Sequence, residues 1–167
     1  MATLTAIEIC AGAGGQALGL HRAKFRHLDV VEVDNDACKT LSLNRRRLGL
    51  PRHLGISPRD VRDYSYKMPD GQRLDLLAGG IPCPPFSMAG KKLGRLDDRD
   101  LFPEVLRLVR ELEPKALMIE NVKGLLSKRF DEYREEIEEA LTNRGLITVF
   151  WDVVEASDFG VPQRRPR

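Results

Sequence analysis

A cysteine between prolines is the feature of this sequence that most favours covalent chemistry. Cys83 lies in the segment GGIPCPPFS, residues 79–87, directly after a short apolar run. The prolines restrict the backbone around the sulfur, and the glycines allow a substrate to come close. Because the thiolate is the reactive form and nearby cations lower the pKa of a thiol, Cys83 is a candidate nucleophile. A small buried cysteine is the alternative, and it is the better interpretation for Cys10 and Cys38.

Glu120 is the candidate acid to accompany Cys83. It follows the apolar run of residues 116–119, at the point where a strand would end. In open α/β sheets ligands bind at the carboxyl ends of the strands, so both side chains are expected at that edge. A partly buried carboxyl group can bond to a ring nitrogen or protonate it. A helix cap or an ion pair is the alternative role for Glu120.

Two basic segments could hold a negatively charged ligand. The chain closes on QRRPR, residues 163–167, whose arginines could hold a phosphate or a substrate base; a solvated basic tail is the alternative. A second cluster is suited to a phosphate backbone or to a solvated loop, and consists of Lys91, Lys92, Arg95 and Arg99. The formal net charge of +2 decides neither case, because a near-neutral total can hide a one-sided basic face.

A glycine-rich turn, residues 12–17, matches the GxGxxG/A pattern of dinucleotide-binding turns. Glu32 follows about twenty residues later, where a carboxylate can accept hydrogen bonds from both hydroxyl groups of a ribose. This order predicts a cofactor with an adenosine moiety, and leaves NAD, FAD and S-adenosylmethionine open. Asp60 could accept a hydrogen bond from an adenine amino group, or could be an ordinary turn residue.

The elements that must position these residues are short strands alternating with helices. Continuous apolar runs are typical of parallel strands buried on both faces, and they predict strands at residues 4–9, 28–33, 74–78, 116–119 and 147–154. Residues 52–59 are too polar to assign to a third strand before Asp60. The alternation predicts an α/β fold with a mostly parallel sheet.

Apolar spacing and capping residues predict three helices. The first covers residues 36–48, with Asn35 or Asp36 as its cap. The others cover residues 101–112, capped by Asp100 with Pro103 in the first turn, and residues 130–144, with Tyr133, Ile137 and Leu141 on one face and Gly145 at the end. Residues 79–99 show no clear element, and a loop of that length in a compact domain is usually functional or mobile.

Length and composition place the chain among ordinary globular domains. It has 167 residues, 42% hydrophobic and 31% charged, which suffices for one core without staples. Three cysteines without paired spacing favour neither a disulfide framework nor a zinc site. The sequence has no secretory signal pattern and no long apolar run, so we expect a cytoplasmic protein without a membrane span.

Seven segments, taken in order, resemble the cytosine-5 DNA methyltransferase family along essentially the whole chain. They are IEICAGAGG, VVEVD, the Asp60 segment, GGIPCPPFS, RDLFPEVLRLVRELEP, IENV and QRRPR. The resemblance implies a Rossmann-like fold with helices on both faces of the sheet. It also implies S-adenosyl-L-methionine as cofactor, S-adenosyl-L-homocysteine as product, and double-stranded DNA as partner.

The resemblance also implies residue roles. Cys83 would attack carbon 6 of a flipped-out cytosine, Glu120 would hold or protonate ring nitrogen 3, and Arg165 would support the base. The implied cofactor positions are Gly12, Gly14, Gly15, Glu32, Val33, Asp60, Pro82 and Leu101. The implied structural or DNA-binding positions are Asn121, which would position the Cys83 loop, Gln163 and Arg167, which would organise the final segment, and Ser87, Lys91 and Lys92.

Three residues depart from the family pattern. Cys10 stands where a phenylalanine commonly contacts the adenine, and Val33 where a larger side chain often covers the other face of that ring. Arg59 replaces a frequent glycine before Asp60. These departures bear on the affinity for the cofactor and leave the chemistry unchanged.

The family pattern continues beyond Arg167, with a further strand, a target-recognition region and a returning segment. Residues 1–167 are therefore expected to be one incomplete catalytic and cofactor-binding domain, lacking its last strand and the target-recognition domain. We expect a fragment or one subunit of a split enzyme, which a second chain could complete. Alone, it should bind the cofactor weakly and not methylate specific sites.

Three other functions remain open at this stage. A NAD-dependent oxidoreductase would explain the glycine turn but not the Cys83 loop, IENV and QRRPR together. An RNA cytosine-5 methyltransferase and a non-catalytic partner subunit are the others. The sequence does not distinguish restriction-modification from regulation and does not reveal a recognised DNA site.

Overall fold

The computed structural model describes residues 4–82, 100–146 and 151–167. The chain divides into two compact units. The first consists of residues 1–81 and 107–119, and the second of residues 82–106 and 120–167. The first unit contains the glycine-rich turn, and the second contains most of the predicted catalytic positions.

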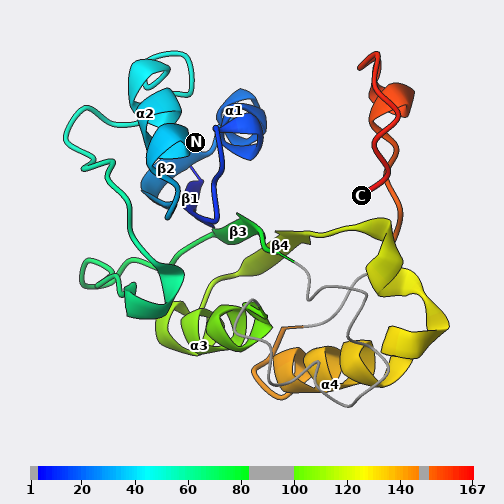
Figure 1. The fold of residues 1–167 in the computed structure, drawn as a ribbon. Helices are drawn as coiled ribbons and strands as arrows, with labels where there is room; N and C mark the ends of the chain where they lie inside the picture. Colours follow the sequence, from blue (N-terminus) through cyan, green and yellow to red (C-terminus); the bar gives the residue numbers. More distant parts are fainter. Residues whose placement is uncertain (1–3, 83–99, 147–150) are drawn as a thin grey trace. The chain divides into compact units, whose positions relative to one another are not determined.

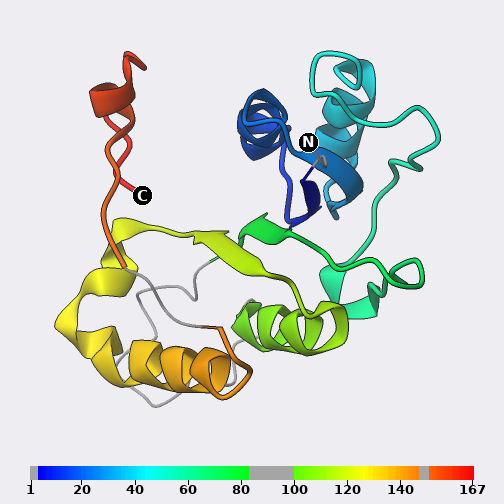
Figure 2. The same cartoon turned by 180° about the vertical axis from the view of Figure 1, so that it is seen from behind.

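A four-stranded sheet forms the centre of the first unit (Figure 1). The strands are β1 (Thr5–Ile9), β2 (Arg26–Val31), β3 (Leu76–Gly80) and β4 (Ala116–Glu120), in the order β2-β1-β3-β4. β1 is parallel to both β2 and β3. β4 starts beside the start of β3, where the Lys115 and Ala116 N–H groups donate to the Leu74 and Asp75 carbonyls (Figure 2). Four predicted strands and the α/β fold class are confirmed, with bounds shifted by at most two residues.

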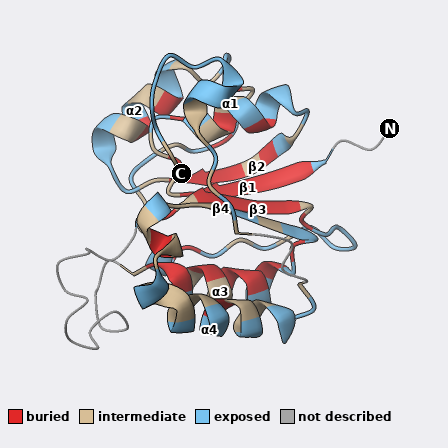
Figure 3. Cartoon of the chain, turned by 90° about the vertical axis from the view of Figure 1, so that its right-hand side faces the viewer, coloured by how far each residue is buried: buried red, intermediate tan, exposed pale blue. Residues whose placement is uncertain are grey.

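The middle strands are buried because they are apolar on both faces. β1 is buried at every position, and β3 at all but its last residue (Figure 3). Ile7, Ile9 and Leu77 are among the largest fully buried side chains of the described residues. A strand covered on both faces lets its carboxyl end carry function while its length anchors the core.

Two helices, α1 (Gly15–Arg22) and α2 (Asn35–Leu43), cover one face of the sheet (Figure 3). The prediction that Asn35 or Asp36 caps α2 is wrong: the cap is Asp34, whose Oδ1 accepts from the Ala37 N–H at 2.7 Å. The prediction that this helix reaches residue 48 is also wrong. The Arg45 N–H bonds to Ser42 O, three residues back instead of four, so the α-helical ladder stops and turns follow.

The third helix, α3 (Phe102–Leu112), begins as its sequence predicts. Asp100 Oδ1 accepts from the Phe102 N–H at 3.0 Å, and Pro103 lies in the first turn. Residues 107–112 of α3 lie on the face of the sheet opposite α1 and α2, with Leu108 and Leu112 buried (Figure 3). This arrangement gives helices on both faces of the sheet.

In the second unit, α4 (Asp131–Thr142) buries Ile137, and Gly145 follows it with φ +79°. Short 3-10 turns complete the described chain, at Val61–Asp63 (η1), Lys123–Leu126 (η4), Lys128–Phe130 (η5) and Ala156–Phe159 (η6).

One strand prediction needs correction, and the sequence leaves the polar segment before Asp60 unassigned. Residues 52–59 form no strand; the Arg45 side chain instead bonds to the carbonyls of Pro51, Arg52 and Leu54. Of the strand predicted at residues 147–154, residues 147–150 lie outside the described residues, and 151–154 are not strand. Val154 and Arg167 instead exchange N–H···O bonds of 2.7 and 3.0 Å, so this segment pairs with the last residues of the chain.

A fully buried hydrogen bond between Glu8 and His27 joins the first two strands. Glu8 Oε2 of β1 lies 3.1 Å from His27 Nε2 of β2, and both side chains have no exposed surface. Burial raises the pKa of Glu8, and the bond to His27 opposes this shift without cancelling it. The folded state therefore holds the Glu8 proton more tightly than the unfolded state does.

This raised pKa makes the free energy of unfolding fall as pH rises above the ordinary value of 4.5, because the unfolded chain releases the proton first. Glu8→Gln removes that dependence, so its stability relative to wild type should increase between about pH 5 and about pH 8. Urea unfolding at both pH values measures the difference. The pKa of Asp75 is lowered by Lys115, so Asp75→Asn should show a constant cost over this range. A constant difference for Glu8→Gln would contradict the prediction.

Candidate cofactor and catalytic site

The order of the strands defines where a ligand binds in this sheet. The chain passes from β1 outward to β2, and later returns to place β3 on the other side of β1. At such a switch point the connections leave neighbouring strands in opposite directions and open a crevice at their carboxyl ends. The glycine-rich turn follows β1, and the chain leaves β3 at Gly80 toward the Cys83 loop. The two segments with candidate chemistry therefore start from adjacent strands.

The turn after β1 adopts a conformation that ordinary residues avoid. Cys10, Gly12 and Gly14 have φ values of 51°, 54° and 94°. Gly14 is the N-cap residue of α1 and makes no side-chain cap, so α1 presents backbone N–H groups at this turn. A Cβ on Gly12 would have no heavy atom within 4 Å, so the turn borders open space there.

Gly79 serves packing within the sheet. It pairs with Ile9, and a Cβ at Gly79 would lie 2.7 Å from Ile9 Cγ1 and 2.9 Å from Ile9 O. Its lack of a side chain therefore allows β3 to lie close to β1. The sequence suggested approach by a substrate as the reason for this glycine, whereas the described contacts assign it to the neighbouring strand.

Glu32 has the most tightly fixed side chain of the predicted cofactor residues. Its Oε2 accepts from the Gly12 N–H at 2.6 Å, and its Oε1 accepts from the Val33 and Asp34 N–H groups at 2.8 Å each. Three backbone donors hold the carboxylate in one orientation beside the glycine-rich turn. Its remaining lone pairs can accept hydrogen bonds from a ribose diol.

Asp60 lies in the same unit and serves both as an acceptor and as a cap. Its Oδ1 accepts from the Arg62 N–H, and its Oδ2 from Arg62 Nη1, each at 2.9 Å. Asp60 is thus the N-cap of η1, which agrees with the turn residue considered from the sequence. The carboxylate stays partly exposed and can accept a further hydrogen bond.

The electrostatics of Cys10 show that these acids act on one location. Burial raises the pKa of the Cys10 thiol to about 12, and the charges of Glu32 and Asp60 add to the shift. Arg62 acts in the opposite direction. Both carboxylates therefore lie close enough to Cys10 to disfavour its thiolate.

Within the second unit, Glu120 meets an arginine. Its Oε1 lies 2.8 Å from Nε of Arg167, and 42% of its side chain is exposed. The ion pair that the sequence left open as the alternative is therefore present. Arg165 is exposed, and its backbone N–H donates to Glu155, so it is the last arginine of QRRPR that contacts Glu120.

The remaining predicted positions are described only in part. Leu101 is buried, Pro82 and Gln163 are exposed, and Asn121 Oδ1 accepts from the Val122 N–H at 2.7 Å. Cys83, Ser87, Lys91, Lys92, Arg95 and Arg99 lie outside the described residues. Their predicted roles remain predictions.

The sequence analysis missed one interaction beside this site, between Arg59 and Asp29. The guanidinium donates to both carboxylate oxygens, at 3.0 and 2.6 Å. An acid inside the apolar run of β2 was the available signal, because a buried carboxylate needs a partner. The sequence could not show that the partner lies thirty residues away.

Comparison with solved structures gives the class of protein. A structure proposed to be a DNA modification methyltransferase, encoded within an E. coli prophage, matches with TM-score 0.71 and 27% identity, covering 98% of this chain and 44% of that one. The S. pombe Dnmt2 methyltransferase matches with TM-score 0.61 and 20% identity, covering 98% and 46%, and shows the fold alone. The fold is that of Rossmann-like methyltransferases that use S-adenosylmethionine.

The chain belongs to the family of C-5 cytosine-specific DNA methylases, whose model matches residues 4–167. The Type II methyltransferase M.NgoMIV of Neisseria gonorrhoeae is 51% identical over 98% of this chain and 49% of its own length. M.NaeI of Lentzea aerocolonigenes is 48% identical, over 100% and 39%. M.AquIA of Picosynechococcus is 35% identical, over 96% and 68%. The chain thus spans about half, or less, of the first two relatives. The family membership removes the oxidoreductase alternative.

The family implies S-adenosylmethionine as methyl donor, and the first unit fits this molecule. Glu32 would hold the ribose through a carboxylate already fixed by backbone bonds, and the partly exposed Asp60 carboxylate would accept from the adenine amino group. The Val33 side chain is 63% exposed, which leaves an apolar surface for the adenine ring.

Among the described helices, none combines the length and apolar character that a membrane crossing requires.

The two turn glycines should respond differently to alanine. In Gly14→Ala the new Cβ would lie 2.7 Å from Leu48 Cδ1 and 2.9 Å from Leu41 Cδ2, at φ +94°, so we expect a loss of about 1–3 kcal/mol in stability. Gly12→Ala is also strained, at φ +54°, but its methyl group enters open space, so it should cost less stability. It should weaken S-adenosylhomocysteine binding more strongly, because that space borders the ligand.

Urea unfolding and isothermal titration calorimetry on the same two variants measure both effects. A larger loss of stability in Gly12→Ala than in Gly14→Ala would contradict the packing argument. Unchanged affinity in Gly12→Ala would contradict the placement of the cofactor.

The raised pKa predicts that the Cys10 thiol is chemically quiet. With a pKa near 12 instead of 9.0, its thiolate fraction at neutral pH is lower by about a thousandfold. Alkylation by iodoacetamide at about pH 7 should therefore be far slower at Cys10 than in a short peptide carrying the same residues. Mass spectrometry of the modified peptides gives the rate. Glu32→Gln removes one charge that raises the pKa, so alkylation of Cys10 should accelerate; an unchanged rate would contradict the assignment.

Proposed function

We propose that this chain transfers a methyl group from S-adenosylmethionine to carbon 5 of cytosine in double-stranded DNA. The observation that carries this proposal is the Glu32 carboxylate, fixed by three backbone N–H groups beside the glycine-rich turn. In a member of the C-5 cytosine-specific family, this is an acceptor ready for the ribose of the methyl donor. The first two relatives are both named Type II methyltransferases, which supports a DNA substrate.

The proposed mechanism is covalent and uses Cys83. Carbon 5 of cytosine is a poor nucleophile, so the reaction needs the ring to be activated first. The Cys83 thiolate adds to carbon 6 of a base flipped out of the duplex, and the ring electrons move toward carbon 5 and nitrogen 3. S-adenosylmethionine supplies an electrophilic methyl group. After carbon 5 has taken it, that carbon loses its proton and the thiolate leaves, which restores the aromatic ring.

Two other residues would stabilise the base during this reaction. Glu120 would hold or protonate nitrogen 3, which accepts the electron density displaced by the thiolate. Its exposed portion is available for a ligand, and its bond to Arg167 fixes its orientation from the other side. Arg165 would contact the base, which is consistent with an exposed side chain on a backbone held by Glu155.

The remaining family assignments are kept as part of the proposal. Pro82 and Leu101 would complete the cofactor site, and Asn121 would position the Cys83 loop. Because the chain covers 49% and 39% of its first two relatives, a second chain carrying a target-recognition region is a candidate partner. Assays should therefore include the chain alone and the chain with such a partner.

Trapping with a 5-fluorocytosine DNA duplex tests the covalent step. Fluorine at carbon 5 cannot leave as a proton does, so the Cys83 adduct should persist through denaturing electrophoresis. Wild-type protein with S-adenosylmethionine should form this complex, and Cys83→Ser should not. Cys38→Ser is the matched control, since Cys38 is a buried residue within α2 and should not take part in trapping.

The outcomes separate the proposal from its rivals. A complex that persists in Cys83→Ser would exclude Cys83 as the nucleophile. Trapping by an RNA duplex and not by DNA would assign the chain to RNA. No trapping by any form of the chain, with or without a partner, would support a non-catalytic subunit.

A further inference from the structure

We propose that Arg59 is a positioning residue for the cofactor. Its hydrogen bonds connect the segment that contains Asp60 to β2 and to Glu32, the residue that follows β2. They thereby fix the distance between the carboxylates of Asp60 and Glu32. This inference deepens the proposed function, since the ligand is the adenosine moiety of the methyl donor. It assigns a role to a residue that stands out in the sequence only as a departure from the family pattern.

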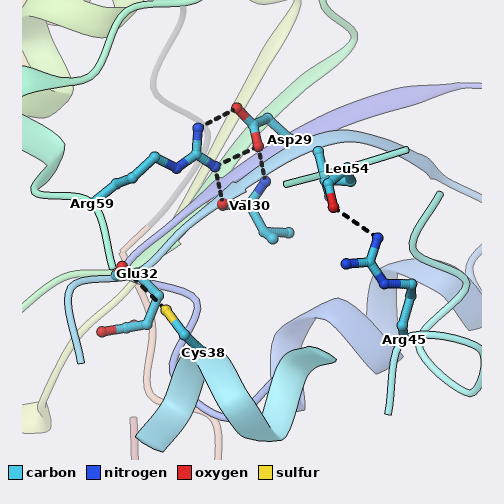
Figure 4. Close-up of polar contacts among 7 residues, drawn as sticks. All are labelled: Asp29, Val30, Glu32, Cys38, Arg45, Leu54 and Arg59. Carbon is cyan, nitrogen blue, oxygen red and sulfur yellow. Dashed lines mark hydrogen bonds and ion pairs between the residues drawn. The ribbon is translucent and has the colours of Figure 1, made fainter. Parts of the chain in front are cut away.

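The side chain of Arg59 makes three bonds to β2 (Figure 4). Its Nη1 and Nη2 donate to Asp29 at 3.0 and 2.6 Å, and Nη2 also donates to the Val30 carbonyl at 2.6 Å. Asp29 is buried, and the bond to it raises the pKa of Arg59, so the guanidinium stays charged. A two-pronged bond between a guanidinium and a carboxylate fixes orientation as well as distance.

The backbone of Arg59 bonds further along the same strand end. Its N–H donates to the Glu32 carbonyl at 2.8 Å, and the Cys38 thiol donates to that carbonyl at 3.4 Å. Arg59 therefore holds β2 through its side chain near Asp29 and through its backbone at Glu32. Asp60 is the next residue, so its position relative to Glu32 follows from these bonds.

The far side of Asp60 is held as well. Nη2 of Arg107 donates to the carbonyls of Val61 and Tyr64, at 3.0 and 2.9 Å. The Tyr64 ring lies against the Arg59 guanidinium, with 5.5 Å between its centroid and Cζ. With both flanks of Asp60 held, releasing the Arg59 side should let Asp60 move relative to Glu32 while η1 stays in place.

A matched control exists in the same unit. Arg45 Nη1 donates to the carbonyls of Pro51, Arg52 and Leu54, at 2.7, 3.1 and 2.7 Å. Figure 4 shows the bond to Leu54. Arg45 fixes a neighbouring loop through as many bonds as the Arg59 side chain makes, but it bonds to neither Glu32 nor the Asp60 segment. Loss of Arg45 should affect stability without affecting how adenosine is recognised.

The variants must avoid leaving a buried charge alone. Arg59→Met would strand the Asp29 carboxylate in the core, and removing one partner of such a pair is strongly destabilising. The test therefore uses Arg59→Met combined with Asp29→Leu, which replaces both charges by apolar groups. Arg59→Lys keeps the charge but cannot form the two-pronged bond. Arg45→Met is the control.

Isothermal titration calorimetry with two ligands reads out positioning. S-adenosylhomocysteine carries the adenine amino group, and S-inosylhomocysteine lacks it. In wild type the first should bind more tightly. In Arg59→Met with Asp29→Leu, the Kd for S-adenosylhomocysteine should rise about tenfold and the ratio of the two Kd values should fall toward one, because a displaced Asp60 no longer accepts from the amino group. Arg59→Lys should be intermediate, and Arg45→Met should keep the wild-type ratio.

The results distinguish a failure of the role proposed for Arg59 from a failure of the proposed cofactor site. If the folded double variant keeps the wild-type ratio, or if Arg45→Met loses it equally, the inference about Arg59 is wrong and the proposed function stands. If wild type binds neither ligand, with or without a partner chain, the proposed cofactor site fails and this inference fails with it. Circular dichroism and thermal unfolding establish that each variant is folded before it is titrated.

Discussion

The hold of three backbone N–H groups on the Glu32 carboxylate is the interaction on which the described site depends. One of these donors, Gly12, belongs to the turn after β1, and the other two follow β2 directly. A single side chain therefore joins the ends of two neighbouring strands. A carboxylate bonded to several backbone donors cannot rotate freely. The Glu32 carboxylate thereby supplies a fixed polar group beside the glycine-rich turn, whose glycines carry no side chain.

The same strand end is reinforced from a second direction. The Glu32 carbonyl accepts from the Arg59 N–H and from the Cys38 thiol, so the residue is held through its backbone as well as its side chain. Asp34 caps α2 two residues later. The end of β2, the start of α2 and the segment that carries Asp60 are thus all bonded to residues 32–34. Preorganisation of this kind reduces the ordering that a ligand must impose when it binds, because the acceptors already point in their binding directions.

The sequence predicted those parts of the structure whose cause is local. Apolar runs identified β1 to β4, and the spacing of glycines and Glu32 identified the turn, because a strand, a tight turn and an acid at its edge follow from neighbouring residues. It failed where the cause is distant. The cap of α2 was assigned one or two residues too late. Residues 147–154 were assigned to a strand of the sheet, although Val154 pairs with Arg167. The bond from Arg59 to Asp29 and the packing of Gly79 on Ile9 are equally non-local, since nothing near either residue specifies its partner.

The acids of the cofactor site also explain why its own cysteine is unsuited to be the nucleophile. Burial of Cys10 favours the thiol over the thiolate, and the negative charges of Glu32 and Asp60 favour it further. Any chain that binds a ribose and an adenine through carboxylates creates negative potential there, so a reactive thiolate must lie elsewhere. The acidic surroundings that would suit a ribose and an adenine therefore keep the Cys10 thiol protonated at neutral pH.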